Sequence, residues 1–82
     1  MLNSLQRTIT VKAFGQLSDS TRKAEWQMQA ADTDHLQAQI SELYPELLGK
    51  NYLLAVNEFI VSENTVLEEN DTVALLPPFS GG

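Results

Sequence analysis

The final stretch of the sequence, LLPPFSGG at residues 75–82, contains the residues best suited to chemistry. Its last six residues are Pro77, Pro78, Phe79, Ser80, Gly81 and Gly82. A main-chain carboxylate at Gly82 is ionised at neutral pH, and a carboxylate anion is a poor electrophile. Its carbonyl carbon must be activated before it can accept a nucleophile. The sequence therefore predicts an end that another protein activates and uses.

The residues of this stretch also predict a mobile tail that projects from the fold. Pro77 and Pro78 fix φ, favour an extended path and offer no N–H, so the preceding strand cannot lengthen. Six extended residues reach roughly 20 Å, which is enough to enter a site in another protein. Gly81 and Gly82 lack Cβ atoms, so a pocket in a partner can close around the backbone and leave the carbonyl open to attack.

The rest of the composition excludes most other sites. The 82-residue chain has no cysteine, which rules out disulfides and thiolate chemistry. His35 is the one histidine, and we expect it to be solvated or to cap a helix, because a metal needs several ligands. No Ser-His-Asp set or glycine-rich phosphate loop is visible. We therefore expect no metal, no permanently bound cofactor and no catalytic site within the chain itself.

Charge and hydropathy narrow the class of partner. Eleven carboxylates against five basic side chains give a net charge of -6, which disfavours nucleic acid and favours a partner with a basic face. A group of acidic residues is expected to form a solvated edge: Glu63, Glu68, Glu69 and Asp71. No membrane span or signal peptide is visible, so we expect a soluble, cytoplasmic protein that does not bind membranes.

The first half of the chain predicts a hairpin followed by a helix. Alternating apolar residues indicate strands at residues 8–14 and 24–30, joined by the turn-forming residues 15–22. A helix follows, with Thr33 as its N-cap, and Pro45 should end it. Apolar residues at helical spacing form its buried stripe: Leu36, Ile40, Leu43 and Leu47.

The second half predicts three more strands, at residues 52–56, 59–61 and 72–76, with turns at Asn57-Glu58 and at Asn70. This order of elements is that of an α+β, β-grasp (ubiquitin-like) fold, in which one main helix covers one face of a mixed sheet. We expect one domain at residues 1–76, with residues 1–7 as an N-terminal extension, and an extended tail at residues 77–82.

Strand parity also predicts an apolar patch on the open face of the sheet. If Val11 and Leu75 face the helix, Phe14 and Leu76 face the other way, and Ile60 can join them. Because an open face is commonly polar, these three residues indicate a partner-binding surface. The alternative is that they are single apolar residues scattered over the surface.

Residues 53–82 (LLAVNEFIVSENTVLEENDTVALLPPFSGG) resemble the small subunits of molybdopterin synthase, the MoaD family of sulfur carriers. The resemblance rests on AVN at residues 55–57, the strand and acidic turn up to Asp71, and above all the PPxSGG ending. VKAF at residues 11–14 extends it towards the start of the chain. This sequence has Asn70 where members often have glycine, and Leu75-Leu76 where an aromatic pair is usual.

The resemblance implies a function for the tail. An E1-like (MoeB-like) enzyme would use ATP to adenylate Gly82, and a sulfur donor such as a cysteine desulfurase or rhodanese would convert it to a thiocarboxylate. This end would then donate sulfur to a pterin precursor in a MoaE-like large subunit, building the dithiolene of molybdopterin. The implied assembly is a heterotetramer with two copies of each subunit.

Two other functions stay open at this point. The chain could carry sulfur for another pathway, or act as a ubiquitin-like modifier joined to lysines, because the same acyl-adenylate serves both routes. It could also be a plain β-grasp binding module whose tail is incidental.

Overall fold

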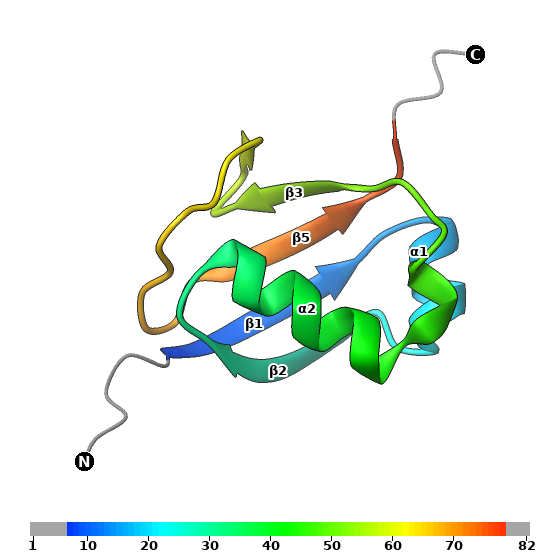
Figure 1. Ribbon diagram of the computed structural model, residues 1–82, viewed down its shortest axis with the longest axis horizontal. Coiled ribbons are helices and arrows are strands. Elements are labelled where there is room, and N and C mark those ends of the chain that lie inside the picture. The colour runs from blue at the N-terminus through cyan, green and yellow to red at the C-terminus, as the bar shows by residue number, and fades with distance from the viewer. Residues whose placement is uncertain (1–6, 79–82) are drawn as a thin grey trace.

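The computed structural model describes residues 7–78 of the chain (Figure 1). Strand β1 (Arg7–Ala13) is an interior strand of the sheet, and the apolar side of its alternating sequence is buried, with Ile9 and Val11 fully enclosed. It begins at Arg7, the last residue of the expected extension, and residues 1–6 lie outside the described part. Strand β2 (Glu25–Ala30) pairs with β1 in antiparallel register, which confirms the predicted strand pair.

The connection between β1 and β2 is not the simple turn that was predicted. It contains a short helix, α1 (Gln16–Thr21). Leu17 and Thr21 lie one helical turn apart and are both buried. The Thr21 hydroxyl donates to the Lys23 carbonyl at 2.7 Å, and the Ser18 hydroxyl donates to the Gly15 carbonyl at 2.9 Å. Hydroxyl residues that usually favour turns therefore stabilise a helix here, because they bond the backbone that flanks its two ends.

Helix α2 (Thr33–Leu43) begins one residue earlier than predicted, because Asp32, not Thr33, is its N-cap. The Asp32 carboxylate accepts a hydrogen bond from the His35 backbone N–H at 2.8 Å. Thr33 has another role: its buried hydroxyl accepts from the Thr65 backbone N–H at 2.9 Å. This bond ties the start of α2 to the long loop before the last strand.

The predicted helical stripe is correct except at Leu43. Leu36 and Ile40 are fully buried, but Leu43 is 59% exposed. The helix ends there, before Pro45, and Tyr44 packs against the core instead, with its ring centroid 5.2 Å from that of Trp26. A short 3-10 helix, η1 (Pro45–Leu47), then brings Leu47 into the core.

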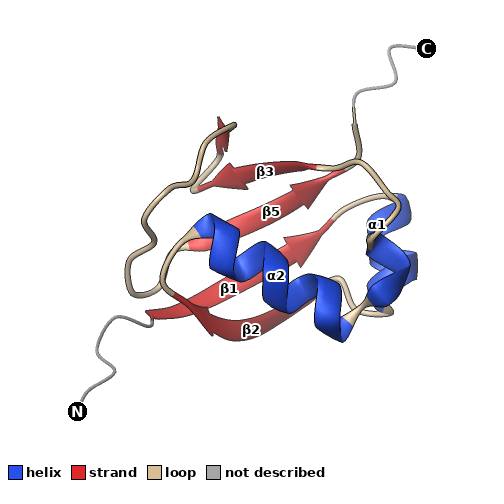
Figure 2. Cartoon of the chain, in the orientation of Figure 1, coloured by secondary structure: helices blue, strands red, loops and turns tan. Residues whose placement is uncertain are grey.

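Three strands complete the sheet: β3 (Leu53–Val56), β4 (Phe59–Val61) and β5 (Thr72–Leu76). The strand order is β2-β1-β5-β3-β4, with β1 and β5 parallel and the other pairs antiparallel. Asn57, Glu58 and Asn70 have positive φ, as the predicted turns require. Figure 2 shows α2 lying across one face of this mixed sheet, which confirms the predicted β-grasp fold. No helix within residues 7–78 is long and apolar enough to cross a bilayer.

Candidate functional site at the tail base and the open face

The tail begins where the predicted prolines follow β5. The strand ends at Leu76, its Leu75 side chain is fully buried, and the Leu75 carbonyl accepts a hydrogen bond from the Phe14 N–H at 3.1 Å. Pro77 and Pro78 come next and are exposed. The last strand is therefore firmly held up to its final residue, while the first residues of the tail lie at the surface.

The other predicted tail residues lie outside the described part of the chain: Phe79, Ser80, Gly81 and Gly82. Two loops flank the prolines at the tail base. The residues around this groove come from the β1–α1 corner, from the loop before β3 and from the tail itself: Gln16, Leu17, Lys50, Asn51, Pro77 and Pro78. The tail thus starts between two parts of the fold that are distant in sequence.

The predicted partner patch lies on the sheet face opposite α2. Phe14 is 46% exposed and Ile60 is 62% exposed, while Leu76 is partly exposed. Because side chains alternate along β5, the Leu76 side chain points away from the face on which Leu75 is buried. Phe14 borders the open face, and the register of Ile60 with Ala55 gives Ile60 the same parity, although Ile60 also borders a groove at the β4 edge that α2 residues line. Their role in binding remains a prediction.

Sequence reasoning missed a fourth member of this face, Leu53, which is 39% exposed. It is the register partner of Leu76, in the β3–β5 pair. The signal was available, because Leu53 is out of phase with the inward Leu54. We define the open-face patch as these four apolar residues: Phe14, Leu53, Ile60 and Leu76.

A hollow of about 350 Å³ lies beside this patch. Ala55 and Ala74 are register partners and leave space because their side chains are small. The other residues around the hollow are Lys12, Phe14, Asn57, Glu58 and Thr72. An apolar side chain of a partner could enter this space, with Lys12 and Glu58 as oppositely charged groups at its border.

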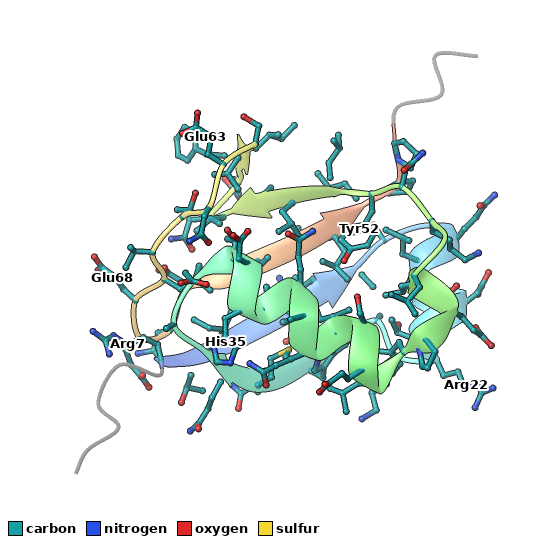
Figure 3. The ribbon with its side chains drawn as sticks, in the orientation of Figure 1. Arg7, Arg22, His35, Tyr52, Glu63 and Glu68 are labelled. Atoms are coloured by element: carbon teal, nitrogen blue, oxygen red, sulfur yellow. The ribbon has the colours of Figure 1, made fainter. Side chains whose placement is uncertain are left out.

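The acidic edge divides into two kinds of carboxylate. Glu63 and Glu68 are exposed on the loop between β4 and β5 (Figure 3). In contrast, the Glu69 carboxylate accepts from the Thr8 N–H at 2.9 Å, and Asp71 accepts from the Glu68 N–H at 2.8 Å. Glu69 and Asp71 therefore stabilise the loop, and Glu63 and Glu68 are the carboxylates most free to meet a basic partner.

His35 lies in the first turn of α2 (Figure 3). Its ring Nδ1 accepts from the Ala31 N–H at 3.4 Å and its Nε2 lies 3.3 Å from Gln39 Nε2, so the imidazole joins the residue before the helix to the helix itself, whereas the N-cap is Asp32. Among residues 7–78 no cluster of three or more histidine or carboxylate side chains could hold a metal.

Comparison with known proteins gives consistent matches over almost the whole chain. A family model described as the ThiS family matches residues 11–82. The chain is 34% identical over 80 residues to the molybdopterin synthase sulfur carrier subunit of Mycobacterium tuberculosis, and the match covers 90% of this chain and 96% of that protein.

Solved structures show the same fold. One is the complex of subunits 1 and 2 of the molybdopterin-converting factor from Helicobacter pylori, where the matching chain is 29% identical with a TM-score of 0.70. This match covers 92% of the present chain and 99% of that one. Small archaeal modifier protein 1 of Methanosarcina acetivorans has a TM-score of 0.81 at 19% identity, covering 94% and 98% of the two chains, and this likeness concerns the fold alone. Because the family model and the mycobacterial relative each match most of its length, the chain belongs to the ThiS family.

Proposed function

We propose that this protein is the sulfur-carrier small subunit of a molybdopterin synthase. The observation that carries the proposal is the 34% identity to the mycobacterial sulfur carrier subunit over 90% of this chain. The family match continues to residue 82, so it includes the PPFSGG tail. We place the protein in the cytoplasm, where ATP and the activating enzyme are available.

The chemistry begins at the ionised carboxylate of Gly82. One carboxylate oxygen attacks the α-phosphorus of ATP in an E1-like enzyme, pyrophosphate leaves, and an acyl-adenylate forms. The terminal sulfur of a cysteine persulfide, held by a sulfur donor such as a cysteine desulfurase or rhodanese, then attacks the carbonyl carbon, and AMP leaves. A thiol reduces the S–S bond of the resulting acyl disulfide, which releases the thiocarboxylate at Gly82 and leaves a disulfide on the thiol side. ATP is consumed by the activating enzyme, and no cofactor stays on the carrier.

The fold supports this chemistry by holding the tail out from the domain. The bond from Phe14 to the Leu75 carbonyl fixes the end of β5, and Pro77 and Pro78 cannot extend the sheet because they lack N–H groups. Six extended residues span roughly 20 Å, so Gly82 can reach the bottom of a partner's site while the domain remains outside.

We propose that the large subunit binds the pterin precursor that accepts the sulfur. The related Helicobacter chain is found with subunit 2 of the same factor, which supports a MoaE-like partner for this protein. The open-face patch is the proposed docking surface, because its apolar side chains are exposed and one of them, Phe14, borders the hollow. A dithiolene contains two sulfurs, so two carriers serve each product, and we propose an assembly with two copies of each subunit.

The alternative is a carrier for another pathway or a modifier joined to lysines. The likeness to the archaeal modifier supports this alternative only through the fold. Two consecutive prolines form a stiff segment of roughly 6 Å, and such a segment suits one deep pocket better than many different surface lysines.

Reconstitution tests the proposal. The chain is incubated with ATP, the activating enzyme and a sulfur donor, then mixed with the large subunit and the pterin precursor. We expect one dithiolene product for every two thiocarboxylated chains consumed. Chains that lack Gly82, or that carry one extra residue after it, should unfold at the same temperature and form no product. Full activity of the chain that carries one extra residue after Gly82 would contradict the proposal.

A further inference from the structure

We propose that Gly15 is a positioning residue for the tail: its bare Cα lets the Pro77 ring pack against the β1–α1 corner, and this contact sets the direction in which the tail leaves the sheet. The kinetic consequence rests on the proposed function, whereas the contact itself does not.

The backbone at Gly15 has a conformation that requires glycine. Its φ is 59° and its ψ is -136°, a combination that residues with a Cβ rarely adopt. Hydrogen bonds hold both sides of this residue. Before it, the Phe14 N–H donates to the Leu75 carbonyl at 3.1 Å; after it, the Ser18 N–H donates to the Gly15 carbonyl at 3.2 Å. The corner is therefore well fixed.

Pro77 packs directly over this corner. A Cβ placed on Gly15 would lie 2.9 Å from Pro77 Cγ, whereas carbon atoms in favourable contact are about 3.5–4.0 Å apart. Pro77 Cγ belongs to a ring that closes on the main-chain nitrogen, so it cannot rotate away as the end of a flexible side chain does. Any group that displaces this ring therefore displaces the main chain of the tail.

A second loop lies on the other side of the prolines. Lys50 and Asn51, in the loop before β3, line the same groove as Pro77 and Pro78. The first residues of the tail thus lie between this loop and the corner at Gly15, across an open groove from the loop. Because both borders belong to the folded domain, the exit direction of the tail is a property of the fold.

The direction of the main chain at Pro77 matters for the reactive end. Gly82 lies five residues after Pro77, so a displaced Pro77 main chain changes the direction in which the segment that carries Gly82 leaves the fold. A misplacement of about 1 Å at a reacting group can reduce a rate about a hundredfold. The direction of the tail therefore matters more for the reaction step than for docking, which uses the open-face patch.

Gly49 provides a matched control. A Cβ at Gly49 would meet nothing within 4 Å, and Gly49 does not have positive φ. Gly15→Ala and Gly49→Ala make the same chemical change near the tail base, but only the first is expected to displace Pro77.

The test combines four variants: Gly15→Ala, Gly49→Ala, Pro77→Ala and the double variant with Ala at 15 and 77. NMR first measures the NOE between the Gly15 α-protons and the Pro77 ring protons, and residual dipolar couplings report the direction of the tail. Gly15→Ala should change the tail couplings, and the double variant should match Pro77→Ala. If the NOE is absent, or if the couplings do not respond to Gly15→Ala, the inference is overturned regardless of sulfur chemistry.

The kinetic arm measures kcat and KM for thiocarboxylate formation. Gly15→Ala should lower kcat at least about tenfold with little change in KM, and Gly49→Ala should change neither. In the double variant, kcat should equal that of Pro77→Ala, although the lower stability caused by positive φ at residue 15 persists. If the double variant instead lowers kcat by the product of the two single-variant factors, Gly15 has only a structural role.

Two further outcomes are decisive. If Gly15→Ala does not fold, Pro77→Ala alone must alter the tail couplings and lower kcat, and unchanged values would overturn the inference. If the wild-type chain shows the NOE but never forms a thiocarboxylate, the proposed function fails while the tail couplings still test the contact.

Discussion

The two faces of the sheet are built from the same strands but have opposite properties. On the face covered by α2, the side chains of Val11, Val73 and Leu75 are fully buried. On the other face, the open-face patch leaves large apolar side chains in solvent, and Leu76 directly follows Leu75 in the chain. Neighbouring residues of β5 therefore contribute to different properties, one to stability and the next to the proposed docking surface. A single substitution on β5 can change one property without the other.

The largest effect is expected on the covered face. Leu75→Ala removes a fully buried side chain and should lower the free energy of unfolding by about 2–5 kcal/mol. The matched control is Leu76→Ala, which should lower it by about 1 kcal/mol or less. Urea unfolding of both variants measures the difference, and equal losses would contradict the division between the two faces.

A substitution on the open face should affect binding instead. Leu76→Asp removes apolar contact and places a charge in the proposed interface, so the dissociation constant for the large subunit should rise about 30-fold, or about 2 kcal/mol. Leu43→Asp is the control, because Leu43 is equally apolar and 59% exposed but lies on α2. Calorimetric titration that finds the same affinity for both variants would remove the patch from the account.

The cap of α2 should show a smaller effect that is confined to stability. Asp32→Ala removes the acceptor of the His35 N–H and should lower the free energy of unfolding by about 1 kcal/mol. Asp34→Ala, in the first turn of the same helix, should lower it by about 0.5 kcal/mol or less. Neither change should alter affinity for the large subunit, and a loss of affinity with Asp32→Ala would show that the covered face contributes to binding.

The smallest effect concerns long-range charge. With a net charge of -6, association with a basic partner should slow severalfold as ionic strength rises from about 0.01 M to 0.1 M, because the Debye length falls from about 30 Å to about 10 Å. Glu63→Gln, at an exposed carboxylate, should reduce this dependence. Stopped-flow rates that stay constant with salt would mean that apolar contact dominates the encounter.

Most of the fold could be predicted because its strands and α2 have clear apolar periods. The positive φ at Asn57 and Asn70 followed from residue types that tolerate it. Helix α1 could not be predicted, since Ser18 and Thr21 are turn formers in isolation and become helical through their hydroxyl bonds and the burial of Leu17. Leu43 was misassigned because it is the last residue of α2, and the side chain of the following Tyr44 packs against the core in its place.

The site was only partly accessible to sequence reasoning. Parity along β1 and β5 placed Phe14 and Leu76 on the open face, and the same parity along β3 could have placed Leu53 there. Only the pairing of Leu53 with Leu76 depends on the β3–β5 register. The approach of Gly15 to Pro77 joins residues that are far apart in sequence, and no local pattern reports it. Long-range pairings such as these are where a single sequence carries least information.

Intact-mass analysis of the protein isolated from cells tests the central claim most directly. The account predicts a free chain, part of which carries one sulfur in place of one oxygen at Gly82. This species should disappear when the activating enzyme is deleted, whereas deletion of the large subunit should leave it in place. A series of lysine conjugates on many proteins, with no thiocarboxylate form of the chain, would contradict the sulfur-carrier function.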